Sequence, residues 1–180
     1  AGWRDLPEAM RGEVLAIAVN ASAPVFQRLL GEVQTEPDRT RRRELFTALA
    51  TVSDVTRQRT VLALLLDPKV DIRETQWMLF QPNREANRAV AQQFFQDHKD
   101  EILERIPSEG TASGQALLAF VFTQSCEPAR REEIASYAMA TFAKMDGGIR
   151  IVQQAVEAMD QCIARRGLVE PAIRAWLGKP

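Results

Sequence analysis

The sequence is poor in the residues that carry chemistry near neutral pH. Among 180 residues it has one histidine, His98, and one tyrosine, Tyr137. A serine or cysteine nucleophile needs a base to take its proton, and the only histidine has no visible partner. His98 lies in the charged run 96–101, so we expect a solvated surface residue, and we expect a packing role for Tyr137 in its apolar helical setting. We therefore predict no catalytic residue and no cofactor or metal site in this chain.

Cysteine is also scarce, since the chain has only Cys126 and Cys162. Two cysteines are too few for the disulfide framework of a small secreted domain. They could pair if the fold brings them together, which the sequence does not show. We expect two ordinary buried thiols.

The sequence has no excess of charge of either sign and no long apolar run. Its 23 Lys and Arg residues against 24 Asp and Glu residues leave a net charge of −1. Nucleic-acid binding needs a strong positive field. The only basic cluster is flanked by acidic residues, so we predict a solvated helix start there and no nucleic-acid partner. Its members are Arg39, Arg41, Arg42 and Arg43. No stretch approaches the ~20 apolar residues that span a bilayer.

Apolar residues recur with helical spacing along nearly the whole chain. Leu45, Ala48, Leu49 and Val52 follow the i, i+3, i+4, i+7 pattern, and segments 26–33 and 10–18 repeat it. Sustained period-2 runs of β-branched residues, which indicate strands, are absent. The pattern predicts helices near 7–19, 23–34, 38–52, 54–66, 72–80, 84–105, 113–125, 128–145, 149–166 and 169–177.

Proline and polar residues mark the helix ends. Four prolines stand where helices should begin, because the first helical amides have no partner to lose. They are Pro7, Pro24, Pro37 and Pro128. Asp71 and Glu74 predict a capping box, in which Asp71 accepts from the backbone at Glu74 and the Glu74 side chain reaches back. Turn signals fall at 81–83 and in a polar loop at 108–113.

Short connections make consecutive helices antiparallel neighbours. About ten short helices favour an all-α, curved α-solenoid of antiparallel pairs, of the HEAT or armadillo kind, over a four-helix bundle. We treat residues 1–180 as one domain. The sequence opens at Ala1-Gly2-Trp3 without an export signal. We expect a soluble fragment of a longer protein, whose own N-terminus would decide between a cytoplasmic and an exported location.

The helix predicted at 149–166 has two distinct stripes. Its apolar residues step by three and four, so they share one face that we expect to be buried: Ile149, Val152, Val156, Met159 and Ile163. A polar stripe lies almost opposite: Arg150, Gln154, Glu157 and Gln161. We expect this polar stripe to be solvated, although it could also line a water-filled cavity.

The residues of this segment are similar to the end of a known enzyme family. That family ends in a helix of the form Arg-x-Val-x-Gln-x-x-Glu-x-Ile-x-x-Asn-Ile, followed by a closing helix ending in Trp-Leu. The form is kept here by Arg150, Val152, Gln154, Glu157, Ile163, Trp176 and Leu177. The chain thus resembles the aminopeptidase N-like zinc aminopeptidases, the gluzincin family that includes endoplasmic-reticulum and puromycin-sensitive aminopeptidases.

Other segments agree with this resemblance, which runs from about Leu6 to Leu177. Residues 43–54 are similar to the family's Leu-x-Ala-Leu-x-x-Thr-x-Asp segment, and 64–76 fit its next helix-turn-helix. Residues 81–84 depart from the family's Asn-Pro-x-Gly, and 98–100 depart from its Trp-Asp. These shared motifs concern helix packing and not catalysis.

The resemblance implies a non-catalytic, C-terminal helical domain of a longer enzyme that removes N-terminal residues from peptides. Such a domain packs on the catalytic domain and encloses the substrate cavity. The zinc motif His-Glu-x-x-His and the element Gly-x-Met-Glu-Asn are absent from this chain, so zinc is expected in the catalytic domain. Arg150 is the one candidate for a substrate-cavity residue, because a cation there could bind a peptide carboxylate. The favoured alternative is an ion pair of Arg150 with Glu157 or a neighbour.

The residues also permit a second hypothesis, a free-standing helical-repeat scaffold that binds a protein on its concave face. The parent reading frame distinguishes the two, since only the enzyme has a His-Glu-x-x-His several hundred residues upstream. An isolated enzyme domain should also expose the apolar surface meant for its missing partner, which could drive self-association.

Overall fold

The computed structural model describes residues 2–80, 84–106 and 114–178, and every regular element within these ranges is a helix. Ten α-helices and five short 3-10 helices occur among the described residues, and no strand does. The predicted all-α class is therefore confirmed. The turn expected at 81–83 and the loop expected at 108–113 lie outside the described residues.

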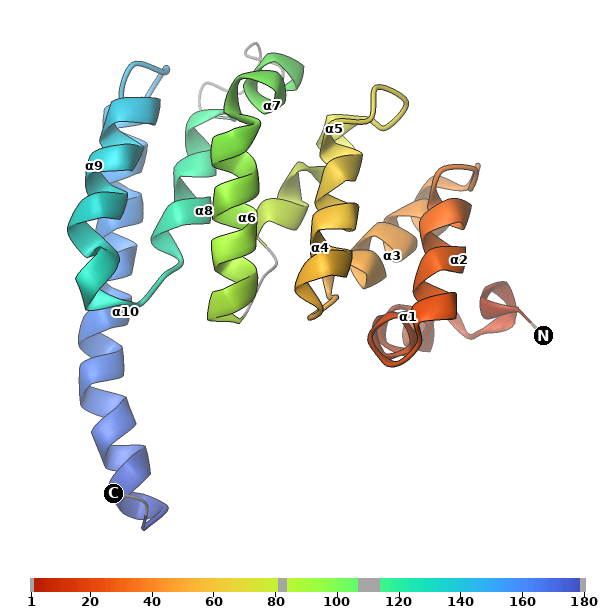
Figure 1. Ribbon diagram of the computed structural model, residues 1–180, viewed down its shortest axis with the longest axis horizontal. Helices are drawn as coiled ribbons and strands as arrows, with labels where there is room; N and C mark the ends of the chain where they lie inside the picture. The colour runs from red at the N-terminus through yellow and green to blue at the C-terminus, as the bar shows by residue number, and fades with distance from the viewer. Residues whose placement is uncertain (1, 81–83, 107–113, 179–180) are drawn as a thin grey trace. The chain divides into compact units, whose positions relative to one another are not determined.

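The chain divides into two compact units, residues 1–105 and 106–180. In the first unit, α1, α2 and α3 pack against one another, and α4 packs against α6 (Figure 1). Its elements are η1 (Trp3–Asp5), α1 (Glu8–Ala21), α2 (Ala23–Val33), α3 (Arg39–Ala50), α4 (Val55–Leu62), η2 (Ala63–Leu65), α5 (Ile72–Thr75), η3 (Gln76–Phe80), α6 (Glu85–Asp97) and α7 (Lys99–Arg105).

In the second unit, α10 packs against α8 and α9. Its elements are η4 (Ala116–Leu118), α8 (Ala119–Thr123), η5 (Pro128–Arg130), α9 (Arg131–Phe142) and α10 (Gly148–Trp176). Tyr137 packs against Phe122 with ring centroids 4.7 Å apart and ring planes tilted by 45°, the packing role expected of it. That the two units form a single domain and a curved solenoid stays a prediction.

Helix starts follow the local signals in the sequence. Pro7 precedes α1, Pro24 lies in the first turn of α2 and Pro128 begins η5. The Asp38 side chain accepts from the backbone of Arg41 at 2.9 Å. Such caps satisfy amides that the helix itself leaves unpaired.

The core of the first unit is built from the predicted faces of α2 and α3. Leu45, Ala48 and Leu49 are fully buried, as are Phe26 and Val33. These faces bury apolar surface between neighbouring helices, which is the main driving force for their packing.

The buried face of helix α1 differs from the predicted one. Its Met10, Val14 and Ile17 face lies exposed, with 68% of Ile17 accessible, while Leu15 and Val19 are buried. Apolar residues occur all around α1, so periodicity alone does not select the inner face. Buried Arg11 lies on the inner side because its guanidinium binds both carboxylate oxygens of Glu44, at 3.1 and 2.9 Å. The face that packs is thus chosen partly by an ion pair.

Several helix boundaries differ from the prediction, and two of the differences concern α6, α7 and α10. The helix expected at 84–105 breaks at His98, whose φ of −121° leaves the helical region, so α6 and α7 are separate. No Gly or Pro marks this break in the sequence. The helices expected at 149–166 and 169–177 form one helix, α10, with Pro171 inside it. Glu170 pairs with Arg166 at 3.0 Å and with Arg174 at 2.6 Å, and these i, i+4 pairs support the helix across Gly167 and Pro171.

The buried face of α10 is also rotated from the predicted stripe. Val152 and Met159 are fully buried as expected, but Ile149 is 56% exposed and Ile151 and Ala155 are buried in its place. Gly147, in the left-handed region at φ 66°, turns the chain into α10. The first turn of α10 then lies so close to the end of α9 that the Gly148 backbone approaches Phe142.

Candidate functional site

Arg150, the predicted cavity residue, lies in the first turn of α10 and is exposed to solvent. The other three residues of the polar stripe, Gln154, Glu157 and Gln161, are exposed as well. Glu157 accepts from Gln161 at 3.4 Å, so the expected pair with Arg150 does not form. Within the described ranges the Arg150 side chain makes no hydrogen bond and no ion pair. A cation in the first turn also opposes the helix dipole, so local electrostatics do not explain Arg150.

The described residues do not fit a metal centre. No three His, Cys, Asp or Glu side chains among them come close enough to hold an ion. His98 is half-buried, which corrects the expected solvated position, and its ring lies 4.7 Å from that of Phe94. Neither the zinc of the family nor a step that depends on it can be assigned to these side chains, and zinc elsewhere in the parent protein stays a prediction.

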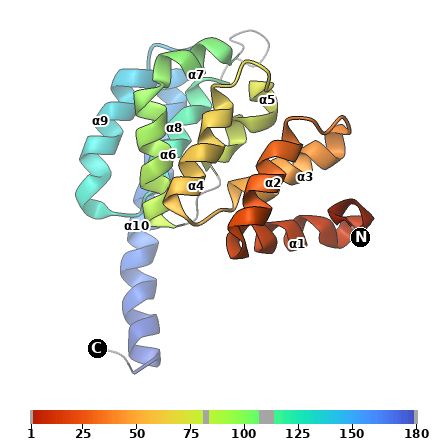
Figure 2. The same cartoon turned by 45° about the vertical axis from the view of Figure 1, so that its right-hand side comes forward.

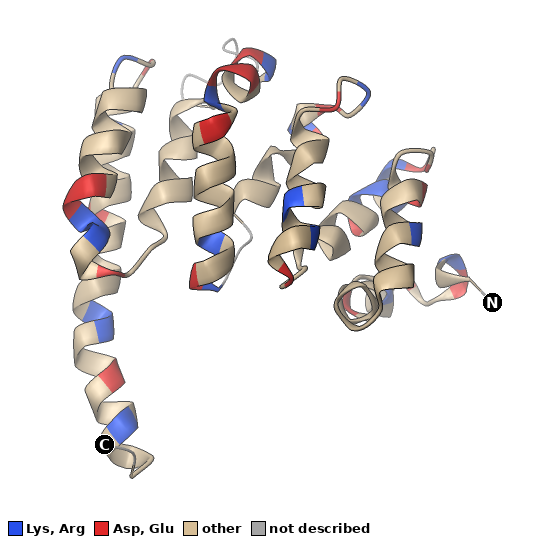
Figure 3. Ribbon diagram, in the orientation of Figure 1, with Lys and Arg blue, Asp and Glu red and all other residues tan. Residues whose placement is uncertain are grey.

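A groove in the first unit brings together residues that the sequence analysis treated separately. Arg39 and Arg43 of α3 line it on one side, and Arg73, Glu74 and Trp77 of the α5–η3 segment line it on the other. Its volume is about 650 Å³. Figure 3 marks the basic residues at the start of α3. The basic cluster at 39–43 was expected to be only a solvated helix start, and no local signal in the sequence connects it to Trp77.

Glu74 organises this groove instead of capping its own helix. Its carboxylate binds Arg42 through two hydrogen bonds of 2.8 and 3.0 Å and Arg39 at 3.2 Å. Asp71 accepts from the backbone of Arg73 at 3.0 Å, so the predicted capping box does not form. The competing attraction of two guanidinium groups on α3 outweighs the local bond.

The Arg42 hydrogen bond holds the pKa of Glu74 below its usual value, and burial opposes this only in part. A carboxylate with a lowered pKa in the folded state stabilises the fold above its unfolded pKa, and this stability is lost as the pH falls through the folded value. We expect the free energy of unfolding to fall between about pH 5 and pH 3. Glu74→Gln should make that fall shallower, as measured by urea denaturation across this range.

The control for this experiment is Glu104→Gln, which removes the same charge from an exposed side chain of α7 that has no ion pair among the described residues. It should leave the pH dependence unchanged. Equal slopes for Glu74→Gln and the wild type would show that the Arg42–Glu74 pair adds nothing to stability at neutral pH.

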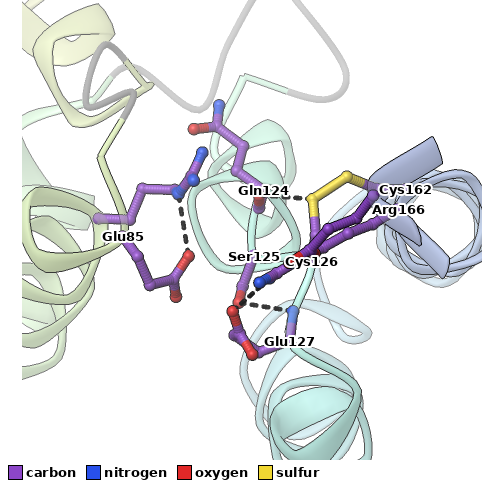
Figure 4. Close-up of a disulfide and its surroundings, with 9 residues drawn as sticks. Glu85, Gln124, Ser125, Cys126, Glu127, Cys162 and Arg166 are labelled. Carbon is purple, nitrogen blue, oxygen red and sulfur yellow. Dashed lines mark hydrogen bonds and ion pairs between the residues drawn. A yellow bond between two sulfur atoms is a disulfide. The ribbon is translucent and has the colours of Figure 1, made fainter. Parts of the chain in front are cut away.

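The two cysteines form a disulfide in the second unit, so the expectation of buried thiols is wrong. Cys126 precedes η5 and Cys162 lies in α10, with Cα atoms 5.4 Å apart (Figure 4). Both residues are half-buried. Next to the bond, Arg166 of α10 pairs with Glu127. A covalent and an ionic link therefore join α10 to the start of η5.

The C-terminal half of α10 has no buried residue from 164 to its end at Trp176, and Leu177, which follows it, is exposed as well. Figure 2 shows it extending beyond α8 and α9 of its own unit. Large apolar side chains of this segment are exposed, and Val169, Ile173 and Leu177 lie on one side of it: Leu168, Val169, Ile173, Trp176 and Leu177. In the first unit, Met10, Val14 and Ile17 of α1 are likewise exposed, so each unit carries an exposed apolar helix face. None of the described helices combines the length and the apolar character needed to cross a membrane.

Comparison with known families decides what kind of domain this is. The family model described as ERAP1-like C-terminal domain matches residues 1–161. The chain belongs to this family. A search of curated proteins gave no match. As an ERAP1-like C-terminal domain, the chain is a domain of the aminopeptidase type, and such a domain associates with a catalytic domain. The resemblance in residues 149–163 pointed to the same family.

Proposed function

We propose that this ERAP1-like domain is the non-catalytic C-terminal part of a zinc metallo-aminopeptidase, where it packs on the catalytic domain and encloses the substrate cavity. The family match over residues 1–161 is the observation that carries the proposal. The parent enzyme would remove N-terminal residues from peptides, and this chain would act by its shape.

The exposed apolar faces support the packing part of the proposal. Monomeric proteins seldom leave large apolar side chains grouped on one face, and such groups mark interaction sites. Trp176 is 85% exposed and Ile17 is 68% exposed. In the complete enzyme the catalytic domain would cover at least one of these faces.

Hydrogen exchange tests the packing role. In the complete enzyme, peptides covering α1 or the end of α10 should be protected more strongly than in this chain alone. Helix α9 serves as the internal reference, because Met139 is its only exposed large apolar residue. Equal protection of all three segments in both proteins would contradict packing.

The chain alone should neither cleave an aminoacyl anilide nor hold stoichiometric zinc, and turnover with bound zinc would reject the non-catalytic role.

Arg150 tests the cavity role. It is exposed and has no partner in the described parts of the chain, and its guanidinium could bind a peptide carboxylate. In the complete enzyme, Arg150→Ala should lower kcat/KM for long peptides by about tenfold, because a charge-assisted hydrogen bond is lost. An aminoacyl anilide, which has no carboxylate to reach Arg150, should be cleaved as before. Arg59→Ala, at another exposed arginine, should change neither rate. An unchanged substrate profile for Arg150→Ala would show that Arg150 does not contact substrate in the cavity.

A further inference from the structure

The groove between α3 and the α5–η3 segment has an excess of positive charge. Arg39, Arg43 and Arg73 line it together with one acid, Glu74. Two adjoining residues, Arg42 and Asp71, add one charge of each sign. This excess is local, because the whole chain has a net charge of −1. A concave surface that concentrates one sign of charge attracts ligands of the opposite sign.

Arg39 and Arg43 retain most of their hydrogen-bond donors, whereas Arg73 already donates from Nε and Nη2 to Asp71 at 2.7 to 3.1 Å and offers a ligand only its Nη1. Within the described ranges the Arg43 side chain has no acidic partner. Arg39 makes a single contact of 3.2 Å to Glu74, and its side chain is 82% exposed. The nearest carboxylate, that of Glu74, is already engaged by Arg42 through both oxygens. The groove therefore offers planar guanidinium groups, which bind carboxylates through paired hydrogen bonds.

Trp77 supplies an apolar wall beside these cations. Its ring N–H donates to the Glu74 carbonyl oxygen at 2.7 Å, which fixes the side chain and uses its only polar atom. Trp77 is half-buried and lines the groove. A rigid aromatic surface next to guanidinium groups suits a ligand with both a carboxylate and apolar groups.

We propose that this groove binds a carboxylate-bearing segment of polypeptide, with Arg39, Arg43 and Arg73 contacting the carboxylates and Trp77 contacting the adjoining apolar groups. The volume of about 650 Å³ accommodates several side chains. Single-stranded nucleic acid is a poorer fit, because its binding sites stack successive bases on several aromatic rings and only one ring is present here. The inference does not rest on the proposed function, since it concerns a site that lies wholly within the first unit.

Fluorescence anisotropy with labelled peptides tests the proposal on the intact chain. A peptide in which Glu alternates with Leu is compared with a peptide of the same length in which Gln replaces Glu. The wild type should bind the Glu peptide at least about tenfold more tightly, and added salt should weaken this binding. Arg43→Gln should reduce affinity for the Glu peptide by about tenfold, and Arg43→Lys, which keeps the charge but loses the planar fork, should fall between.

The matched control is Arg59→Gln on α4, an exposed arginine outside the groove with no partner among the described residues. It should bind the Glu peptide like the wild type. The Arg43 side chain is exposed and has no hydrogen bond or ion pair among the described residues, so its variants should unfold at the same urea concentration as the wild type. A second variant, Arg73→Gln, probes the opposite side of the groove and should weaken binding as well.

Four outcomes would overturn the proposal. Equal affinity for the Glu and Gln peptides would mean that carboxylates are not recognised. Unchanged binding by both Arg43→Gln and Arg73→Gln would place the peptide elsewhere. Tighter binding of oligothymidylate than of the Glu peptide would make the groove a nucleic-acid site. Inorganic phosphate should displace the peptide only weakly, and displacement as efficient as that by unlabelled Glu peptide would identify a site for a free small anion instead.

Discussion

Reduction of the Cys126–Cys162 disulfide is expected to lower the free energy of unfolding of the second unit by about 4 kcal/mol. The bond joins residues separated by 36 positions, and the loop that it closes contains η5, α9 and the first half of α10. Without the bond the unfolded chain gains the entropy of that open loop, so unfolding becomes more favourable. Urea denaturation of this unit, with and without reductant, measures the difference.

Cysteine variants provide the control for this prediction. Cys126→Ala and Cys162→Ala each remove the same covalent bond, so each single variant and the double variant should lose similar stability. Additive losses would instead indicate two independent thiols. The native protein for these measurements must be prepared without reductant, because disulfides persist only in oxidising surroundings. Alkylation of either cysteine in the native, unreduced protein would contradict the bond.

Replacing Gly148 by alanine is expected to destabilise the second unit by about 3 kcal/mol. A Cβ atom at this position would lie 1.9 Å from the backbone oxygen of Phe142 and 2.9 Å from its carbonyl carbon. Relief requires the start of α10 to move away from the end of α9. Phe142 is fully buried, so the α9 end is held in place by the core and the strain falls on packing between the two helices.

Gly167→Ala is the matched control, since it makes the same change in the same helix. A Cβ atom at Gly167 meets nothing within 4 Å. Alanine is the better helix former, so this variant should gain up to about 1 kcal/mol. Chemical denaturation of the two variants should therefore show effects of opposite sign. A loss at both positions, or at neither, would mean that the approach of α10 to Phe142 is not what constrains Gly148.

Much of the fold follows from local information in the sequence. The spacing of Leu45, Ala48 and Leu49 predicted a buried helix face, and these residues are fully buried. The prolines before α1 and in the first turn of α2 marked helix starts, because a missing amide hydrogen costs nothing there. The order of helix-packing residues in 149–163 indicated the family. These predictions needed only neighbours within a few turns of helix.

The failed predictions concern choices that local sequence leaves open. Apolar residues all around α1 allow more than one inner face, and the ion pair of Arg11 with Glu44 on α3 helps to select one. Glu74 had a local partner in the expected capping box, yet it binds Arg42, which lies 32 positions earlier. Charge attraction across packed helices outweighed the local hydrogen bond.

The sequence by itself therefore determined that this protein is all-helical, where most helices begin, which family it belongs to and which residue types it lacks. Only the tertiary structure decided that Cys126 meets Cys162, that Arg43 shares a groove with Arg73 and Trp77, and which faces stay exposed. The physical reason is distance along the chain. Helix formation and capping depend on residues within one or two turns, whereas a bond, a groove or an exposed face depends on which helices pack together.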